Sequence, residues 1–271
     1  MKSMSGSNRG DGFRPALVLV LAAIGLMGSA PAAIAGEAGL APGFVRLGAV
    51  APEIRQDLRY FGADNFTGRK VPGYEAGECI LARPVAEALG RVQARLERDG
   101  YGLLVFDCYR PVRAVQGFMA WASGQAGAGD RAYFPRIPRD RIIPLGYVAR
   151  RSSHSRGTSV DLTLVFLPGQ AAAPGTEGGP ARKQASDAAA TCLEAARFNR
   201  SADEVDMGTA FDCFDVMSHT ASKAVGAAQR ANRKRLVDAM AREGFENYAR
   251  EWWHFSMPLA GYGKARDFTV R

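Results

Sequence analysis

Histidine is rare in this chain, and the surroundings of two of its three histidines could support metal chemistry. His154 lies in the segment SSHSRGTSVD, which ends with Asp161. His254 lies in the segment EWWHF, which begins with Glu251. Two imidazoles and one carboxylate are a ligand set of catalytic zinc sites, in which the fourth position stays open for water. We therefore consider His154, Asp161 and His254 as ligands of one Zn²⁺ ion.

A zinc hydrolase also needs a base and a cation beside the metal. The base takes a proton from water and later delivers it to the leaving amine, and Glu251 is close in sequence to His254. The cation stabilises negative charge on the reacting carbonyl, and Arg110 follows a predicted buried strand and precedes Pro111. Each residue also has an ordinary structural interpretation, such as a cap, a core hydrogen bond or a surface carboxylate. Spacing alone leaves both interpretations open. The motifs HExxH, GxSxG and SxxK are absent from the chain, so the common zinc-protease helix and two serine-hydrolase arrangements are excluded.

Hydrophobic periodicity predicts the elements that would position these residues. Val85, Leu89, Val92 and Leu96 recur at helical spacing, and Gly100 follows them. By such criteria we expect helices at 83–99, 112–123 and 222–243, and strands at 102–106, 161–166 and 251–256. Helices alternate with short strands without a βαβ rhythm. This pattern predicts a single α+β domain with a central antiparallel sheet.

Composition and charge restrict the class of protein. The chain is 47% hydrophobic and 23% charged, which is typical of a globular domain and excludes a disordered one. We expect no stable membrane insertion, because no apolar run reaches the roughly 20 residues that cross a bilayer. The net charge of +8 comes from basic residues scattered along the chain, so we expect no nucleic-acid partner. The oligomeric state is not indicated.

The N-terminal part of the chain and one internal segment differ in composition from the rest of the domain. Residues 1–35 have a basic start, an apolar segment and the sequence AIA, which predict a signal peptide cleaved after Ala35. We therefore expect an exported protein, periplasmic or secreted. Residues 36–48 are predicted to be a flexible lead-in to a domain at 49–271, and residues 168–207 a surface insertion in that domain.

Several separated blocks of this sequence resemble the D-alanyl-D-alanine dipeptidase family, known from vancomycin resistance and peptidoglycan turnover. The blocks are NFTGRKVPGYEA, FDCYRPVRAVQGFMAWA, GYVARRSSHSRG, SSHSRGTSVDLTL and GFENYAREWWHF. The resemblance extends from Ala49 to Tyr262 and is broken by the predicted insertion. It implies a hydrolase related to zinc D,D-carboxypeptidases, with an antiparallel sheet flanked by helices.

For the site, the resemblance implies one Zn²⁺ ion held by His154, Asp161 and His254. It implies that Glu251 is the general base and that Arg110 polarises the scissile carbonyl. The third histidine, His219, is expected to be structural, because a fourth protein ligand would leave no place for water.

The substrate that the resemblance implies is free D-alanyl-D-alanine, a small-molecule D,D-dipeptide. Ser152 and Asp212 match positions that hold its ammonium end. Such a pocket rejects longer chains, because a missing terminal charge would leave a buried carboxylate unpaired. Two alternatives remain: a D,D-carboxypeptidase that acts on longer stem peptides, and a non-catalytic, zinc-dependent module that binds the cell envelope. The insertion leaves strict specificity open.

The four cysteines are expected to form disulfides in an oxidising compartment. Four cysteines allow three pairings, and buried free thiols are the alternative. Location favours Cys192 with Cys213, which would join the insertion to the segment of Asp212. The remaining pair would be Cys79 with Cys108.

Overall fold

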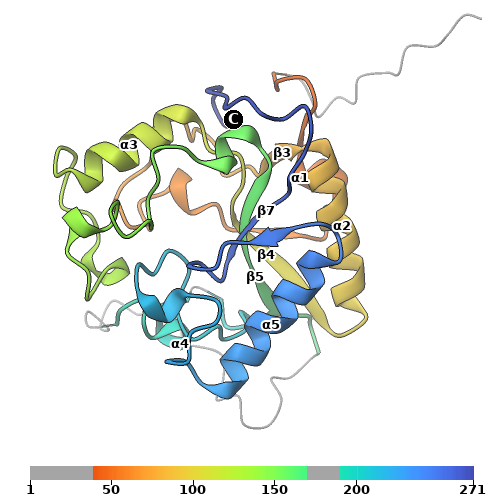
Figure 1. The fold of residues 1–271 in the computed structure, drawn as a ribbon. Helices are drawn as coiled ribbons and strands as arrows, with labels where there is room; N and C mark the ends of the chain where they lie inside the picture. The colour runs from red at the N-terminus through yellow and green to blue at the C-terminus, as the bar shows by residue number, and fades with distance from the viewer. Residues whose placement is uncertain (1–38, 170–189, 200) are drawn as a thin grey trace, which may run out of the picture. The chain divides into compact units, whose positions relative to one another are not determined.

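The computed structural model describes residues 39–169, 190–199 and 201–271, and Figure 1 shows how their helices and strands are arranged. Within these residues no helix has the length and apolar character needed to cross a membrane. The predicted signal peptide lies outside the described residues. In chain order the elements are β1 (Phe44–Arg46), α1 (Leu47–Val50), β2 (Arg55–Gln56), η2 (Arg59–Phe61), β3 (Ile80–Ala82), α2 (Arg83–Glu97), β4 (Tyr101–Asp107), α3 (Val112–Ala122), η3 (Arg131–Tyr133), η4 (Arg139–Arg141), η5 (Ser153–Arg156), β5 (Ser159–Phe166), α4 (Ala195–Phe198), η6 (Val216–Ser218), α5 (Ala227–Ala241), β6 (Glu246–Asn247) and β7 (His254–Ser256).

The main sheet has five strands in the order β2-β4-β5-β7-β6. Its central strand, β5, is buried along almost its whole length and pairs antiparallel with β4 and β7. The sheet is mixed rather than purely antiparallel as predicted, because β2 pairs parallel with β4. A parallel pair needs a long crossover, and the chain between β2 and β4 contains β3 and α2. Strands β1 and β3 form a separate antiparallel pair.

Helices cover the sheet on both sides, with α2 and α5 on one side and α3 on the other (Figure 1). Helix α2 begins with a proline near its N-terminus and buries the apolar residues whose spacing predicted it. Gly100 follows it with φ 81°, a left-handed conformation that favours glycine. Glu243, just after α5, forms ion pairs with Arg91 and Arg95 of α2 and so joins the two helices.

The end of the predicted flexible lead-in is ordered. Phe44 and Val45 are buried in β1, and Leu47 begins α1. The ring of Phe44 meets the rings of Tyr109 and Phe268 edge to face, at centroid distances of 5.7 and 5.3 Å. Three apolar side chains among glycines and alanines are therefore enough to anchor residues 44–48 to the core.

The C-terminal part of the predicted surface insertion packs into the domain. Cys192 is fully buried, Val205 and Met207 are nearly so, and Glu204 forms a β-bridge with Val165 of β5. A disulfide joins Cys192 to Cys213. Residues 190–199 and 201–207 of the predicted surface insertion thus contribute to the core beside β5. Residues 170–189 and 200 lie outside the described residues.

Two predicted elements begin later in the structure than in the prediction. Helix α5 begins at Ala227 rather than at 222, because residues 221–226 form turns and Gln229 caps the extended Gly226. Strand β7 begins at His254 rather than at 251, because Glu251 to Trp253 form a turn closed by a hydrogen bond from His254 N to Glu251 O.

Candidate active site

Three neighbouring strands bring polar side chains into one row across the sheet. Asp107 at the end of β4 pairs in register with Asp161 of β5, and Asp161 pairs with His254 of β7. An irregularity in β4 between Val105 and Asp107 shifts the register just before the row. Because side chains alternate along a strand, Asp161 lies on the face opposite to Val160, away from the apolar contacts of that neighbour. Residues far apart in sequence therefore meet at the same level of the sheet.

His154 reaches this row from the short turn η5 that precedes β5. The hydroxyl of Ser152 accepts a hydrogen bond from His154 N at 3.2 Å and caps the turn. Gly157 ends the turn at φ 70°, and a Cβ atom there would lie 2.3 Å from the ring of Phe44. Only glycine therefore fits this position, and the tight turn places the imidazole of His154 over the sheet.

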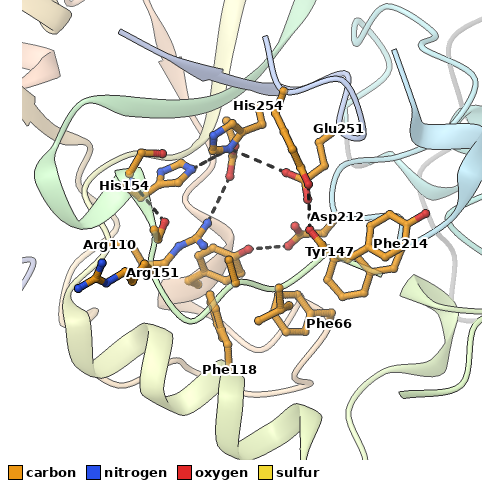
Figure 2. A pocket seen from close by; sticks show the side chains of 18 residues that line it. Phe66, Arg110, Phe118, Tyr147, Arg151, His154, Asp212, Phe214, Glu251 and His254 are labelled. Atoms are coloured by element: carbon orange, nitrogen blue, oxygen red, sulfur yellow. Dashed lines mark hydrogen bonds and ion pairs between the residues drawn. The ribbon is translucent and has the colours of Figure 1, made fainter. Parts of the chain in front are cut away.

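The donor atoms of His154, Asp161 and His254 converge. Figure 2 shows the two histidines next to each other. His154 Nε2 is 3.1 Å from His254 Nδ1 and 3.3 Å from Asp161 Oδ1. His254 Nδ1 is 3.0 Å from Asp161 Oδ1. The structure thus brings together the three residues that the sequence predicted as metal ligands.

The chemistry of these donors fits a divalent metal ion. His154 Nδ1 is 2.6 Å from the backbone oxygen of Cys108, which fixes the tautomer with Nδ1 protonated and leaves the Nε2 lone pair facing the other donors. Burial lowers the pKa of His254, which favours the neutral imidazole that a metal needs. Burial opposes the charge of Asp161, yet the contacts with His154 and His254 hold its pKa well below its ordinary value.

Arg110 lies beside the three candidate metal ligands His154, Asp161 and His254 (the metal-ligand cluster), and Asp107 holds it there. Its Nε donates to Asp107 Oδ2 at 2.9 Å, and its Nη2 is 3.4 Å from Asp161 Oδ2. Burial opposes the guanidinium charge, but Asp107 raises the pKa of Arg110 well above its ordinary value. The guanidinium also lies over the rings of Tyr60 and Phe118, at 5.2 and 5.1 Å from their centroids. A fixed, desolvated cation of this kind can stabilise charge that develops nearby.

Glu251 faces the cluster from the turn before β7. Its Oε2 is 3.8 Å from His254 Nδ1, and its side chain is 12% exposed. Residues three apart in a regular strand would point to opposite faces, so the turn is what turns both side chains toward the pocket. Burial, together with the charges of Asp161 and Asp212, raises the pKa of Glu251 well above its ordinary value. The raised pKa makes the protonated form of this carboxyl group more accessible than in an ordinary glutamate, as suits a group that both accepts and donates a proton.

Asp212 lies across the pocket from His154 (Figure 2) and has an unusual backbone. It is the only residue other than glycine with a positive φ, 59°, among those that the structure describes. It is 5% exposed, and its Oδ2 accepts a hydrogen bond from Tyr60 Oη at 2.7 Å. Burial and the charge of Asp161 raise the pKa of Asp212 to about 8. A strained, desolvated carboxyl group is typical of a functional position.

These side chains line one cavity of about 260 Å³ with aromatic walls. This volume lies just below the range of about 300–1,000 Å³ for pockets that bind drug-sized ligands, and it suits a smaller molecule. Arg151 and its neighbour Ser152 line the cavity. In Figure 2 Arg151 lies at one end and Asp212 at the other, so Ser152 and Asp212 are not side by side, although the resemblance implies that both hold the ammonium end of the substrate. His219 is not part of the three-donor cluster, since its Nε2 contacts Tyr147 Oη at 3.4 Å.

Sequence reasoning did not identify two residues that contact the predicted site. Asp107 holds Arg110 and accepts a hydrogen bond from Tyr74 Oη at 2.7 Å. Its position three residues before Arg110, at the end of a predicted strand, could have indicated this pairing. Tyr60 comes from η2, and nothing in its local sequence distinguishes it from a core tyrosine. Both predicted disulfides are confirmed. The Cys79–Cys108 disulfide links the residue that follows Asp107 to the segment before β3.

The chain is similar in sequence to known dipeptidases. A sequence model of the D-ala-D-ala dipeptidase family matches residues 41–178 and 177–270. The D-alanyl-D-alanine dipeptidase of Enterococcus faecium is 36% identical over 231 residues, which cover 84% of this chain and 98% of the relative. That of Streptomyces coelicolor is 38% identical over 206 residues, covering 75% and 86%. That of Escherichia coli is 28% identical over 216 residues, covering 80% and 85%. This chain belongs to the D-Ala-D-Ala dipeptidase family of metallopeptidases.

Proposed function

We propose that this protein hydrolyses the peptide bond of free D-alanyl-D-alanine and releases two molecules of D-alanine. The names of the relatives support the substrate. The observation that carries the proposal is the carboxyl group of Asp212, 5% exposed and facing the same small cavity as the metal-ligand cluster. In a free dipeptide the ammonium group is on the α-carbon next to the carbonyl of the peptide bond. Asp212 would pair with that ammonium group while the peptide bond lies at the cluster.

The same carboxyl group argues against longer substrates at this end of the cavity. A peptide extended at its amino terminus has an amide in place of the ammonium, so it lacks the positive charge that would stabilise the ionised form of Asp212. Tyr60, Phe66 and Phe214 line the cavity around Asp212 and leave little room for another residue. We therefore favour a dipeptidase over a carboxypeptidase that acts on long stem peptides.

In the proposed mechanism His154, Asp161 and His254 would hold one Zn²⁺ ion. Zinc in such a site acts as a Lewis acid and lowers the pKa of water to about 7. The carboxylate of Glu251 takes the proton of the attacking water and then delivers it to the nitrogen of the leaving D-alanine. A raised pKa suits both steps, because the group must be a base first and an acid afterwards. Glu251 Oε2 lies close to the cluster, at 3.8 Å from His254 Nδ1.

Arg110 stabilises the reaction at the carbonyl oxygen. Its guanidinium is already oriented by Asp107 and shielded by the rings of Tyr60 and Phe118, so little reorganisation is needed when negative charge develops on that oxygen. Asp107 acts through Arg110 and is a positioning residue.

The proposal is tested by assaying the purified protein on D-alanyl-D-alanine with and without a chelator. We expect release of D-alanine that stops on chelation and returns with Zn²⁺. Replacing Glu251 with glutamine should lower kcat by about 10²- to 10⁴-fold while one metal ion stays bound. Glu246→Gln, on the exposed strand β6, is the matched control and should retain activity. Full activity of the Glu251 variant would remove this residue from the mechanism, and activity without any metal would remove the zinc.

A second assay compares substrates of different length. We expect turnover of D-alanyl-D-alanine to exceed that of a pentapeptide ending in D-alanyl-D-alanine. Preference for the pentapeptide would support the carboxypeptidase alternative. Metal binding without turnover of either peptide would support the non-catalytic module.

We also propose that the protein acts outside the cytoplasm, as the predicted signal peptide implies. The two disulfides support this proposal, because disulfides persist in oxidising compartments. Mass spectrometry of the secreted or periplasmic protein should find a chain that begins at Gly36. A chain that retains residues 1–35 in the cytoplasm would contradict it.

A further inference from the structure

A second cavity adjoins the candidate active site on the side of Ser152. Its volume is about 390 Å³. Arg151 and Ser152 line both cavities, so the two cavities adjoin at these residues. The residues that line it are Val112, Val115, Arg150, Arg151, Ser152, Ser155, Arg156, Gly263 and Ala265. The proposed hydrolysis of D-alanyl-D-alanine does not require this second cavity.

The second cavity is strongly basic. Arg150, Arg151 and Arg156 contribute three guanidinium groups, and no carboxylate is among the lining residues. Within residues 39–169, 190–199 and 201–271, none of these three arginines has an ion pair or a hydrogen bond from its side chain. Other arginines of the domain do have carboxylate partners: Arg91 and Arg95 with Glu243, Arg113 with Asp267, and Arg136 with Asp215. Three unpaired guanidiniums around one hollow attract an anion from solution.

The position of this cavity relates it to the carboxyl side of a substrate. In Figure 2 Arg151 lies at one end of the active-site pocket and Asp212 at the other, with Arg110 between them. If the ammonium end of a dipeptide pairs with Asp212, its second residue points toward Arg151 and the basic cavity. A single terminal carboxylate can pair with one guanidinium through two parallel hydrogen bonds. The other guanidiniums then remain available to a second negative charge.

We propose that the arginine cavity (lined by Arg150, Arg151 and Arg156) binds a side-chain carboxylate of the second residue of the substrate. The proposal rests on the proposed function and extends it. The protein then favours D,D-dipeptides whose second residue is acidic, such as D-alanyl-D-glutamate, over neutral ones of the same size. The cavity has room for such a side chain, whereas the methyl group of alanine would leave it empty.

The test compares D-alanyl-D-glutamate with D-alanyl-D-glutamine, which differ in one charge and share the same terminal carboxylate. For the wild-type protein we expect kcat/KM to be about 5-fold higher for the acidic dipeptide, as for a solvent-accessible ion pair. Replacing Arg150 with glutamine should reduce this ratio toward one. The exposed Arg98, which follows α2, is the matched control, because Arg98→Gln removes the same charge away from the cavity.

Calorimetric titration supplies a measurement that does not depend on turnover. The dissociation constants of the two dipeptides are measured on the Glu251→Gln variant, or on the wild type if it hydrolyses neither. A ratio that favours the acidic dipeptide and falls with Arg150→Gln but not with Arg98→Gln supports the arginine cavity. A ratio of one or below in the wild type, or an equal loss in both variants, overturns it. Failure of the proposed function is separate, since it is the absence of D-alanyl-D-alanine hydrolysis.

Discussion

Replacing Asp212 with asparagine should stabilise the protein increasingly as pH rises from about 4 to 8, and should weaken its binding of substrate. Burial and the charge of Asp161 raise the pKa of Asp212 from 3.8 to about 8. Between these pH values the folded protein holds a proton that the unfolded chain has lost, so the free energy of unfolding falls as pH rises. Asparagine has no such proton. Its amide oxygen can still accept the hydrogen bond from Tyr60, and asparagine tolerates the left-handed backbone at this position.

The size of the effect follows from the pKa of Asp212. Each pH unit over which the folded protein holds the extra proton lowers the free energy of unfolding by about 1.4 kcal/mol. Between pH 4 and pH 8 the total is about 6 kcal/mol. We expect about half of this value, because the cavity opens to water and ionised groups there are partly solvated. At pH 4 both side chains are neutral and similar in shape, so the two proteins should be about equally stable.

The assay is urea unfolding of chelator-treated wild type and Asp212→Asn at pH 5, 6, 7 and 8, without reductant so that the disulfides stay intact. The stability advantage of the variant should grow steadily with pH. Asp99→Asn, at an exposed position, is the control and should change stability by less than about 0.5 kcal/mol at any pH. The KM of the metal-loaded Asp212 variant for D-alanyl-D-alanine should rise at least about 10-fold, because an amide cannot replace a charged partner of an ammonium. A stability difference that is the same at every pH would refute the argument about burial.

Three further substitutions test the framework of the site. Replacing Cys79 with serine should weaken zinc binding by about 10- to 100-fold in competition with a chromophoric chelator, because its disulfide partner carries the carbonyl that orients His154. Asp107→Asn should lower kcat by about 10²-fold with unchanged metal content, since Arg110 loses its charged partner. Gly157→Ala should lower the free energy of unfolding by about 1–3 kcal/mol in a denaturant titration, because its left-handed backbone and an adjacent ring leave no room for a methyl group. Unchanged zinc affinity, kcat or stability, respectively, would contradict each argument.

The principal helices and strands could be predicted because their apolar residues repeat with the period of the element. The spacing of Val85, Leu89, Val92 and Leu96 predicts α2 nearly to its ends, and the apolar run at 102–106 predicts β4. The strand β2 could not be predicted in this way, since two residues carry no periodicity. The parallel pairing of β2 depends on a crossover and not on local sequence, which is why the sheet is mixed rather than antiparallel.

The candidate metal ligands could be predicted because histidine is rare in this chain. Because the chain has only three histidines, the segments around His154 and His254 are distinctive, and Asp161 and Glu251 lie in the same segments. The turn at Glu251 was not predicted. An unbroken strand would have directed this side chain away from His254, so the role proposed for Glu251 depends on a turn before β7 that hydrophobic pattern does not reveal.

By itself the sequence determined the residue types of the site, the family and most long elements, because these are properties of short segments. Only the tertiary structure decided which segments meet. It aligned Asp107, Asp161 and His254 across three strands, buried Asp212 against Tyr60 and left a cavity lined by three arginines beside Ser152. The physical reason is that strand register, desolvation and the charge around a group depend on atoms from distant parts of the chain. A local pattern contains no record of those neighbours.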